Sequence, residues 1–315
     1  MSEAQIGAAT QNYSRAIVFM VLAAICFSCM ATGAKAASDN VSSGVSVFVR
    51  GIIAVVVFGI YMWAKGVPFR CRAPGFVHGR CFFGTLSLHL YFYALARAPL
   101  GDVVVLANSA PLFMPLLGLL FLGERPRPLL FVVAGVGFAG VTTLVAPGFS
   151  AVSVGMIAAV GTGVASGGAI TCLKLATSRD HPLTIIFTFS IWTVATSLPF
   201  LVSLEPAAVV PAAPALLFMA LAAIGAQVFL TNAHARAPAG VVSVYSYLGV
   251  VIAFLIGLCF WGEEPPLRSL VGTGMIIAAC VVATRNASRL VDVTGVDEDR
   301  AQEPPAVSKC ASTSR

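Results

Sequence analysis

Apolar runs of about 20 residues recur along almost the whole chain, and they limit its possible folds more than any other feature. An α-helix of that length crosses the roughly 30 Å hydrocarbon core of a bilayer. The 315-residue chain is 58% hydrophobic and only 10% charged, whereas a soluble domain of this size needs more charge to cover its surface. The sequence therefore predicts an all-α polytopic membrane protein embedded in the lipid bilayer.

The apolar runs predict ten transmembrane helices. Residues 1–14 precede the first run and are expected to form a short N-terminal tail. Residues 286–315 are polar and lack periodicity, which predicts a disordered cytoplasmic tail. The ten helices are expected near residues 15–37, 44–63, 74–96, 100–121, 128–146, 152–176, 183–203, 214–235, 239–261 and 267–285.

Lysine and arginine predict the orientation in the membrane. If the N-terminus is cytoplasmic, 15 of the 19 basic residues, including Arg80 and Lys174, fall on the cytoplasmic side. Three fall outside, and the last, Arg50, lies within the second span. Cytoplasmic segments carry the excess of basic residues, so both termini are predicted to be cytoplasmic. Membrane orientation thus accounts for the net charge of +6, and no nucleic-acid partner is expected.

An internal repeat divides the chain into two halves. A shift of 139 residues aligns 94–126 with 233–265 without gaps, and 15 of the 33 positions are identical. The repeat predicts two units, 15–146 and 152–285, with five spans each. Because five is odd, the second unit is inverted in the membrane. Inverted repeats can close one side of a protein while the other opens around a site near the midplane, so the arrangement favours a transporter.

Two duplicated motifs carry a resemblance to a known family. A-x-A-R-A-P stands at 94–99 and 233–238, and G-E-x-P at 123–126 and 262–265. With ten spans in two halves, the chain resembles the EamA family of the drug/metabolite transporter superfamily over about residues 15–285. The resemblance implies a secondary transporter of a small organic metabolite, working by alternating access in a bacterial inner membrane.

Two further stretches are loosely similar to bacterial S-adenosylmethionine uptake proteins. They are VSVFVRGI at 45–52 and Tyr-Ser-Tyr-Leu at 245–248. The substrate classes left open are amino-acid-like, nucleoside-like or S-adenosylmethionine-like metabolites and organic anions.

Arg50 is the first candidate for a binding residue. An ionised arginine within a span costs at least about 2.5–3.5 kcal/mol on insertion scales, so it usually faces a cavity or a partner. Facing a cavity, its guanidinium would bind a carboxylate or phosphate. Two alternatives stay open: the side chain reaches the outer interface, or it holds backbone carbonyls at a helix end.

Polar side chains on four other spans form a second group of candidates. Residues four apart share a helical face, and positions related by the repeat are expected to meet across the pseudo-two-fold axis. Together they would form a midplane binding site, although hydrogen bonding between helices remains the alternative. The candidates are His89 and Tyr93 in the third span, Asn108 in the fourth, Gln227 and Thr231 in the eighth, and Ser243 and Tyr247 in the ninth.

The G-E-x-P motifs are interpreted as structural hinges. Gly123 would end the fourth helix and Glu124 would cap the next one, while Pro126 fits a first helical turn. The copies Gly262 and Glu263 lie on the opposite membrane face, so one substrate site cannot use both glutamates. The motif is therefore expected to shape the fold without touching a solute.

Prolines and glycines predict how the spans bend and pack. Pro111 and Pro115 should kink the fourth span, which suits a gate. Small residues let membrane helices approach closely, and eight glycines within spans are expected to do so. They are Gly33, Gly51, Gly84, Gly118, Gly135, Gly163, Gly257 and Gly274.

No motif points to catalysis. The chain has no G-x-x-x-x-G-K-[ST] phosphate loop and no H-E-x-x-H zinc motif, so no enzyme activity, cofactor or metal is expected. A non-transporting scaffold or sensor on a carrier-derived fold is the alternative to a transporter. Import or export, the coupling ion and a homodimer are left open.

Overall fold

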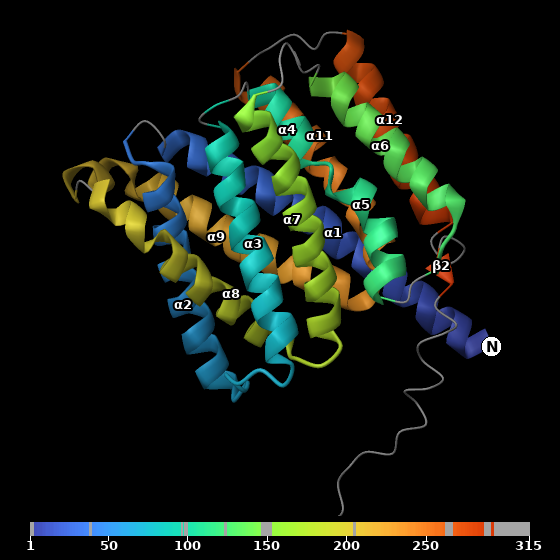
Figure 1. Ribbon diagram of the computed structural model, residues 1–315, viewed down its shortest axis with the longest axis horizontal. Coiled ribbons are helices and arrows are strands. Elements are labelled where there is room, and N and C mark those ends of the chain that lie inside the picture. Colours follow the sequence, from blue (N-terminus) through green and yellow to red (C-terminus); the bar gives the residue numbers. More distant parts are fainter. Residues whose placement is uncertain are drawn as a thin grey trace, which may run out of the picture.

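The computed structural model is a bundle of helices (Figure 1). Each of the ten predicted spans overlaps a helical segment. Eight segments of the described chain are long and apolar enough to cross a membrane, which agrees with a multi-pass membrane protein. The structure describes residues 3–37, 40–95, 97, 100–122, 125–145, 153–203, 206–261, 267–286 and 291–292.

The first repeat contains six α-helices, a π-helical turn and a two-residue strand. The first helix extends back through most of the expected N-terminal tail. The sixth begins two residues after Pro126, which lies in the strand and not in a first helical turn, so this expectation was wrong. The elements are α1 (Glu3–Ala37), α2 (Ser43–Lys65), α3 (Pro74–Leu95), α4 (Leu100–Ala107), α5 (Ala110–Leu117), η1 (Gly118–Leu122), β1 (Arg125–Pro126) and α6 (Pro128–Val145).

The second repeat follows the same order. Its eighth-span helix starts at Pro206, earlier than expected, and β2, within the predicted C-terminal tail, pairs antiparallel with β1. The elements are α7 (Val154–Thr177), α8 (Pro182–Ser197), η2 (Leu198–Ser203), α9 (Pro206–Arg236), α10 (Ala239–Val244), η3 (Tyr245–Tyr247), α11 (Leu248–Trp261), α12 (Leu267–Arg285) and β2 (Val291–Asp292).

The fourth span of each repeat is interrupted, and the two interruptions lie at nearly equivalent positions. In the first half α4 ends at Ala107 and α5 begins at Ala110, just before Pro111. In the second half the 3₁₀ turn η3 separates α10 from α11. The shift of 139 residues relates η3 to residues 106–108. The second break has no proline, so proline is not required for the interruption.

The two repeats interlock. α1 packs along α9, and α3 packs along α7, so each half supplies one helix to each of these pairs. α2 crosses α8, while α6 and α12 form a separate pair at one edge (Figure 1). The centre of the molecule is therefore built by both halves.

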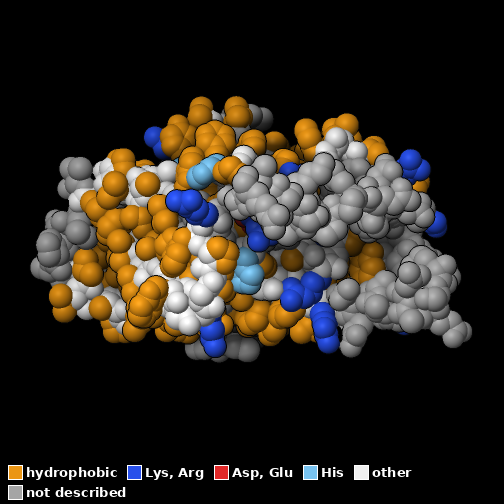
Figure 2. Space-filling view, turned by 90° about the horizontal axis from the view of Figure 1, so that it is seen from below, with side chains coloured by type: hydrophobic (Ala, Val, Ile, Leu, Met, Phe, Trp, Pro, Cys, Tyr) orange, Lys and Arg blue, Asp and Glu red, His pale blue; other side chains and the backbone are white. Residues whose placement is uncertain are grey.

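Apolar side chains cover much of the outer surface, as the view from below shows (Figure 2). Trp63 is 81% exposed and Leu267 is 77% exposed. In water such surface would favour aggregation, whereas in a bilayer it contacts lipid chains. The outer surface therefore fits a membrane environment.

The α6–α12 pair depends on Gly140 and Gly272. A Cβ atom on Gly272 would lie 2.5 Å from the Leu144 nitrogen and 2.6 Å from the Gly140 oxygen, so the two backbones touch. Gly274, one of the glycines expected to allow close packing, has open space around it instead, as does Gly135. Periodicity along one helix does not tell which glycine faces a partner.

We expect Gly272→Ala to lower the free energy of unfolding by about 1–3 kcal/mol, because the added methyl group forces two backbones apart. Thermal unfolding of the purified protein in detergent measures the effect. Gly274→Ala is the matched control on the same helix and should change stability little, since nothing lies within 4 Å of its Cβ position. Equal effects of the two substitutions would contradict the close approach.

Candidate functional site

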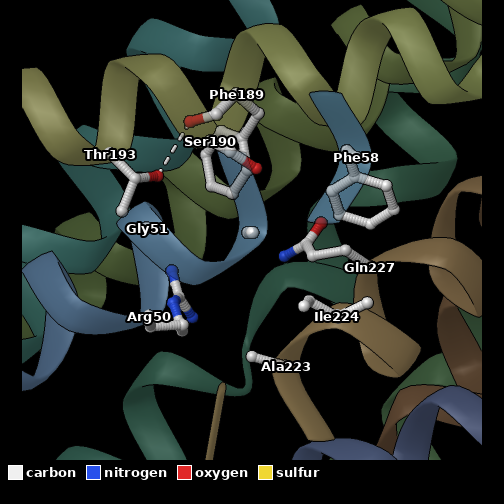
Figure 3. A pocket seen from close by; sticks show the side chains of 10 residues that line it. Arg50, Gly51, Phe58, Phe189, Ser190, Thr193, Ala223, Ile224 and Gln227 are labelled. Carbon is white, nitrogen blue, oxygen red and sulfur yellow. Dashed lines mark hydrogen bonds between the residues drawn. The ribbon is translucent and has the colours of Figure 1, made fainter. Parts of the chain in front are cut away.

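A small cavity lies where α2, α8 and α9 meet (Figure 3). Its volume is about 20 Å³, room for about one water molecule. Polar groups come from all three helices, and the remaining wall is apolar. The lining residues are Arg50, Gly51, Ala54 and Phe58 of α2, Phe189, Ser190 and Thr193 of α8, and Ala223, Ile224 and Gln227 of α9.

The cavity lies on the axis that relates the two repeats. Three pairs of lining residues are equivalent under the 139-residue shift. A pocket lined by both members of several pairs must sit where the two halves meet symmetrically. Carriers built from inverted repeats hold their solutes at such an interface between the repeats. The pairs are Arg50 with Phe189, Gly51 with Ser190, and Ala54 with Thr193.

Arg50 reaches the cavity from α2. Its Nη1 lies 3.5 Å from the sulfur of Met30, which is a weak acceptor. Gly51 brings this part of α2 against α8, because a Cβ there would lie 2.8 Å from Cγ2 of Val194. The close crossing of α2 and α8 thus carries Arg50 to the centre.

The α8 hydroxyl groups present acceptors to the cavity. Ser190 Oγ donates to the Ile186 carbonyl at 2.9 Å, and Thr193 Oγ1 donates to the Phe189 carbonyl at 2.8 Å (Figure 3). Their protons are used within the helix, so their oxygens remain able to accept. Gln227 of α9 supplies an amide beside them. The wall therefore combines one cation with neutral polar groups.

Arg80 lies next to this wall, although charge counting assigned it to a cytoplasmic segment. It is buried, with 6% of its surface exposed. Its Nη2 lies 3.5 Å from Gln227 Oε1, and its guanidinium lies 4.4 Å from the centre of the Phe189 ring. Arg80 lies six residues inside α3 and its side chain turns inward, which the count of basic residues on the cytoplasmic side did not predict.

Of the eight predicted binding residues, Arg50 and Gln227 line the cavity together. The two candidates on α3 do not reach it. His89 stacks on Phe200 with ring centres 5.5 Å apart. Tyr93 is 41% exposed and lies under the guanidinium of Arg97 at 3.8 Å. Neither is among the residues that line the cavity between α2, α8 and α9.

The other four candidates lie in the walls of the bundle. Thr231 is buried in α9, and Ser243 Oγ donates to the Ala239 carbonyl at 2.7 Å. Tyr247 is buried against α6, where its hydroxyl donates to the Ala134 carbonyl at 3.3 Å. Asn108 is partly buried at the break between α4 and α5. Hydrogen bonding between helices, the alternative left open above, describes Tyr247, whereas Ser243 bonds within its own helix.

The expected hinge residues fall into two groups. Pro111 and Pro115 are buried in α5, directly after the break in the fourth span. Gly123, Glu124, Gly262 and Glu263 lie outside the described residues.

Sequence comparison finds a family match and named relatives. The EamA-like transporter family matches residues 14–146 and 153–285. A pseudopaline exporter, CntI of Pseudomonas aeruginosa, is 32% identical over 276 residues, which cover 85% of this chain and 95% of that protein. A riboflavin transporter of Rhizobium johnstonii is 27% identical, with 67% and 70% covered. Solute carrier family 35 member G1 of Mus musculus is 25% identical, with 66% and 61% covered.

A solved structure has the same fold. It superposes with a TM-score of 0.75 at 22% sequence identity, covering 88% of this chain and 99% of its own. The family match covers both repeats and agrees with the duplicated motifs and the interlocked halves. This multi-pass membrane protein therefore belongs to the EamA-like transporter family, within the drug/metabolite transporter superfamily.

Proposed function

We propose that the protein is a secondary transporter of a small organic solute with an anionic group. The observation that carries the proposal is the position of Arg50 in a cavity on the axis between inverted repeats. Its single positive charge faces neutral polar groups from α8 and α9. A carboxylate or phosphate is the ligand that a guanidinium in such a place binds best.

We further propose that the chain crosses a bacterial cell membrane ten times, with both termini in the cytoplasm. The last turn of α2 carries the exposed Lys65, and the connection from α2 to α3, at the bottom of Figure 1, carries the exposed Arg70 and Arg72. These basic residues support a cytoplasmic location for this end. α3 is long enough to span a bilayer, and its polar residues are directed partly into the bundle. α10, η3 and α11 together would form the interrupted ninth span.

Transport is proposed to proceed by alternating access of the two halves. α10 packs against α5 and α6, and α7 packs against α9. The pairs equivalent by the repeat are α4 with α11, α4 with α12, and α1 with α3. In the described part of the chain these pairs make at most isolated contacts. One end of the bundle is thus closed more tightly than its counterpart, as alternating access requires of a single state.

Lys174 supports this proposal, because it links α7 to α9 at the closed end; we call this link the latch. Its amine, on α7, donates to the carbonyl oxygens of His234 at 3.0 Å and Ala237 at 2.9 Å. These carbonyls belong to the last turn of α9 and the residue after it, where backbone acceptors have no partner within the helix. The repeat equivalent of Lys174 is Lys35, whose side chain lies outside the described residues. We propose that Lys35 closes the opposite end in the other state.

The names of the relatives support an organic solute. They include a pseudopaline exporter and a riboflavin transporter. The proposed class includes organic anions and amino-acid-like or nucleoside-like metabolites that bear an anionic group.

Flux through liposomes tests the proposal. The purified protein is screened by thermal unfolding against a panel of small organic anions, and each stabilising compound is then offered to liposomes with and without the protein. Protein-dependent uptake that saturates supports the carrier. The alternative, a non-transporting scaffold or sensor, is favoured by the narrow centre of about 20 Å³. Binding of a compound without any flux would select this alternative.

A further inference from the structure

Arg80 has no carboxylate partner in the described part of the chain. Its contacts are the face of the Phe189 ring and the amide oxygen of Gln227, the latter at the limit of hydrogen-bond length. Asp180 is the one acidic residue whose side chain the structure describes. Its carboxylate accepts from the backbone nitrogens of Arg72 at 2.5 Å and Ala73 at 2.9 Å, where it caps α3. Arg80 is therefore a buried cation held by neutral groups.

Arg50 and Arg80 lie close to the same two residues, because Phe189 and Gln227 line the cavity with Arg50 and are also the contacts of Arg80. Each arginine within a span costs at least about 2.5 kcal/mol on insertion scales, and proximity adds repulsion. Neutral contacts, such as Met30 for Arg50, offset this only in part. An anion between the two guanidinium groups would remove the repulsion and pair both charges. The centre thus carries a charge excess that a ligand can neutralise.

Arg80 also occupies the space that symmetry would leave to the cavity. Ala223 of α9 lines the cavity, and its repeat equivalent on α3 is Gly84. A Cβ on Gly84 would lie 2.1 Å from Nη1 of Arg80, so the guanidinium fills the position against α3. The open space of the cavity therefore lies on the α9 side of the axis, and the equivalent space on the α3 side is filled. A movement of Arg80 away from Gly84 would extend it across the axis.

We propose that Arg80 is the second cation of the solute site, which takes a solute with two anionic groups or with one doubly charged group. The inference rests on the proposed transport function and names its substrate class. In the described state the Phe189 ring and Gln227 hold Arg80 in place. An anionic ligand replaces these neutral partners, pairs with Arg50 and Arg80 together, and opens the space beside Gly84.

The test compares probes of different charge on purified protein in detergent at matched ionic strength. The probes are succinate, with two carboxylates, butyrate, with one, and inorganic phosphate, a compact doubly charged anion. Thermal unfolding at increasing concentration gives an apparent dissociation constant for each. The wild-type protein is expected to bind succinate or phosphate more tightly than butyrate. A preference for succinate indicates two separated anionic groups, and a preference for phosphate indicates one compact group.

The variants separate the two arginines. Arg80→Gln should weaken binding of the preferred doubly charged probe by about tenfold and leave butyrate unchanged, because one charge-assisted contact is lost. Arg50→Gln should weaken binding of every probe. Arg80→Lys keeps the charge and should retain part of the preference. Arg179→Gln removes an exposed arginine outside the site and should change nothing.

Two results would overturn the inference. One is a wild-type protein that shows no preference for doubly charged anions. The other is an Arg80→Gln or, where that variant does not fold, an Arg80→Lys variant whose preference equals that of Arg179→Gln. Liposome flux distinguishes this failure from failure of the transport proposal. Flux without a charge preference refutes only the role of Arg80, whereas a charge preference without flux for any bound probe refutes only transport.

Discussion

Replacing Arg50 with alanine is expected to reduce saturable solute flux by a factor of about 10–150. This range corresponds to the loss of a hydrogen bond to a charged group, about 1.5–3 kcal/mol. The guanidinium lines the central cavity, where it contacts the sulfur of Met30. Its removal should therefore affect the loaded protein more than the empty one. Flux into liposomes measures the loss of transport, and ligand-induced thermal stabilisation measures the loss of binding.

Two variants control this experiment. Arg70→Ala removes an exposed arginine from the α2–α3 connection and should leave flux unchanged. Arg50→Lys retains a charge without the planar fork of the guanidinium and should retain part of the flux. Normal expression and melting temperature of Arg50→Ala, with flux equal to that of wild type, would refute a binding role for Arg50.

The helical segments could be predicted because they depend on one property, the length of an apolar run. A helix satisfies its own backbone groups within hydrocarbon, so each run of about 20 residues becomes helical, with a break in the fourth and ninth runs. The repeat likewise follows from identical residues at a fixed spacing. The exact ends of the helices depend on neighbouring segments and could not be predicted in this way. α6, for example, begins at Pro128, because Pro126 lies in the strand β1.

Which polar side chains come together at the cavity could not be predicted from the apolar runs and the repeat. Tyr247 lies within the 3₁₀ turn that interrupts the ninth span, and this turn changes the direction in which its side chain points. Its ring packs on α6, where a Cβ on Gly137 would lie 2.6 Å from it. A regular helix drawn through the break would assign it another face. The position of His89 and Tyr93 outside the cavity wall could not be predicted for a related reason, since nothing in the sequence of one helix fixes its rotation about its own axis.

Arg80 and Lys174 were both counted among the basic residues on the cytoplasmic side, and this count did not predict that each has backbone or side-chain partners in the bundle. The sequence did contain an indication of which residues surround Arg50. Arg50 and Phe189 are equivalent under the 139-residue shift, so the repeat alone could have placed Phe189 opposite Arg50. That Arg80 stacks on this phenylalanine requires the packing of α3 against α8.

Lys174→Met is expected to shift the protein away from the state closed at the α9 end. The amine makes two charge-assisted hydrogen bonds, to the carbonyls of His234 and Ala237. Their loss leaves two acceptors without their cation and weakens the link from α7 to α9 by about 1.5–3 kcal/mol or more. A shift of this size changes a two-state population by a factor of about 10 or more. Flux should fall, and hydrogen exchange of the backbone amides near the end of α9 should rise.

Lys65→Met is the matched control, because Lys65 also lies in a last helical turn but is exposed. It should alter neither flux nor exchange. Lys35→Met tests the symmetry of the mechanism. If Lys35 closes the opposite end in the other state, its loss favours the state closed at the α9 end, so exchange there should fall while flux also falls. Exchange that rises in both lysine variants would indicate general loosening of the bundle, and unchanged flux in Lys174→Met would refute the latch. Opposite exchange changes with a common loss of flux are what two inverted halves sharing one cycle must produce.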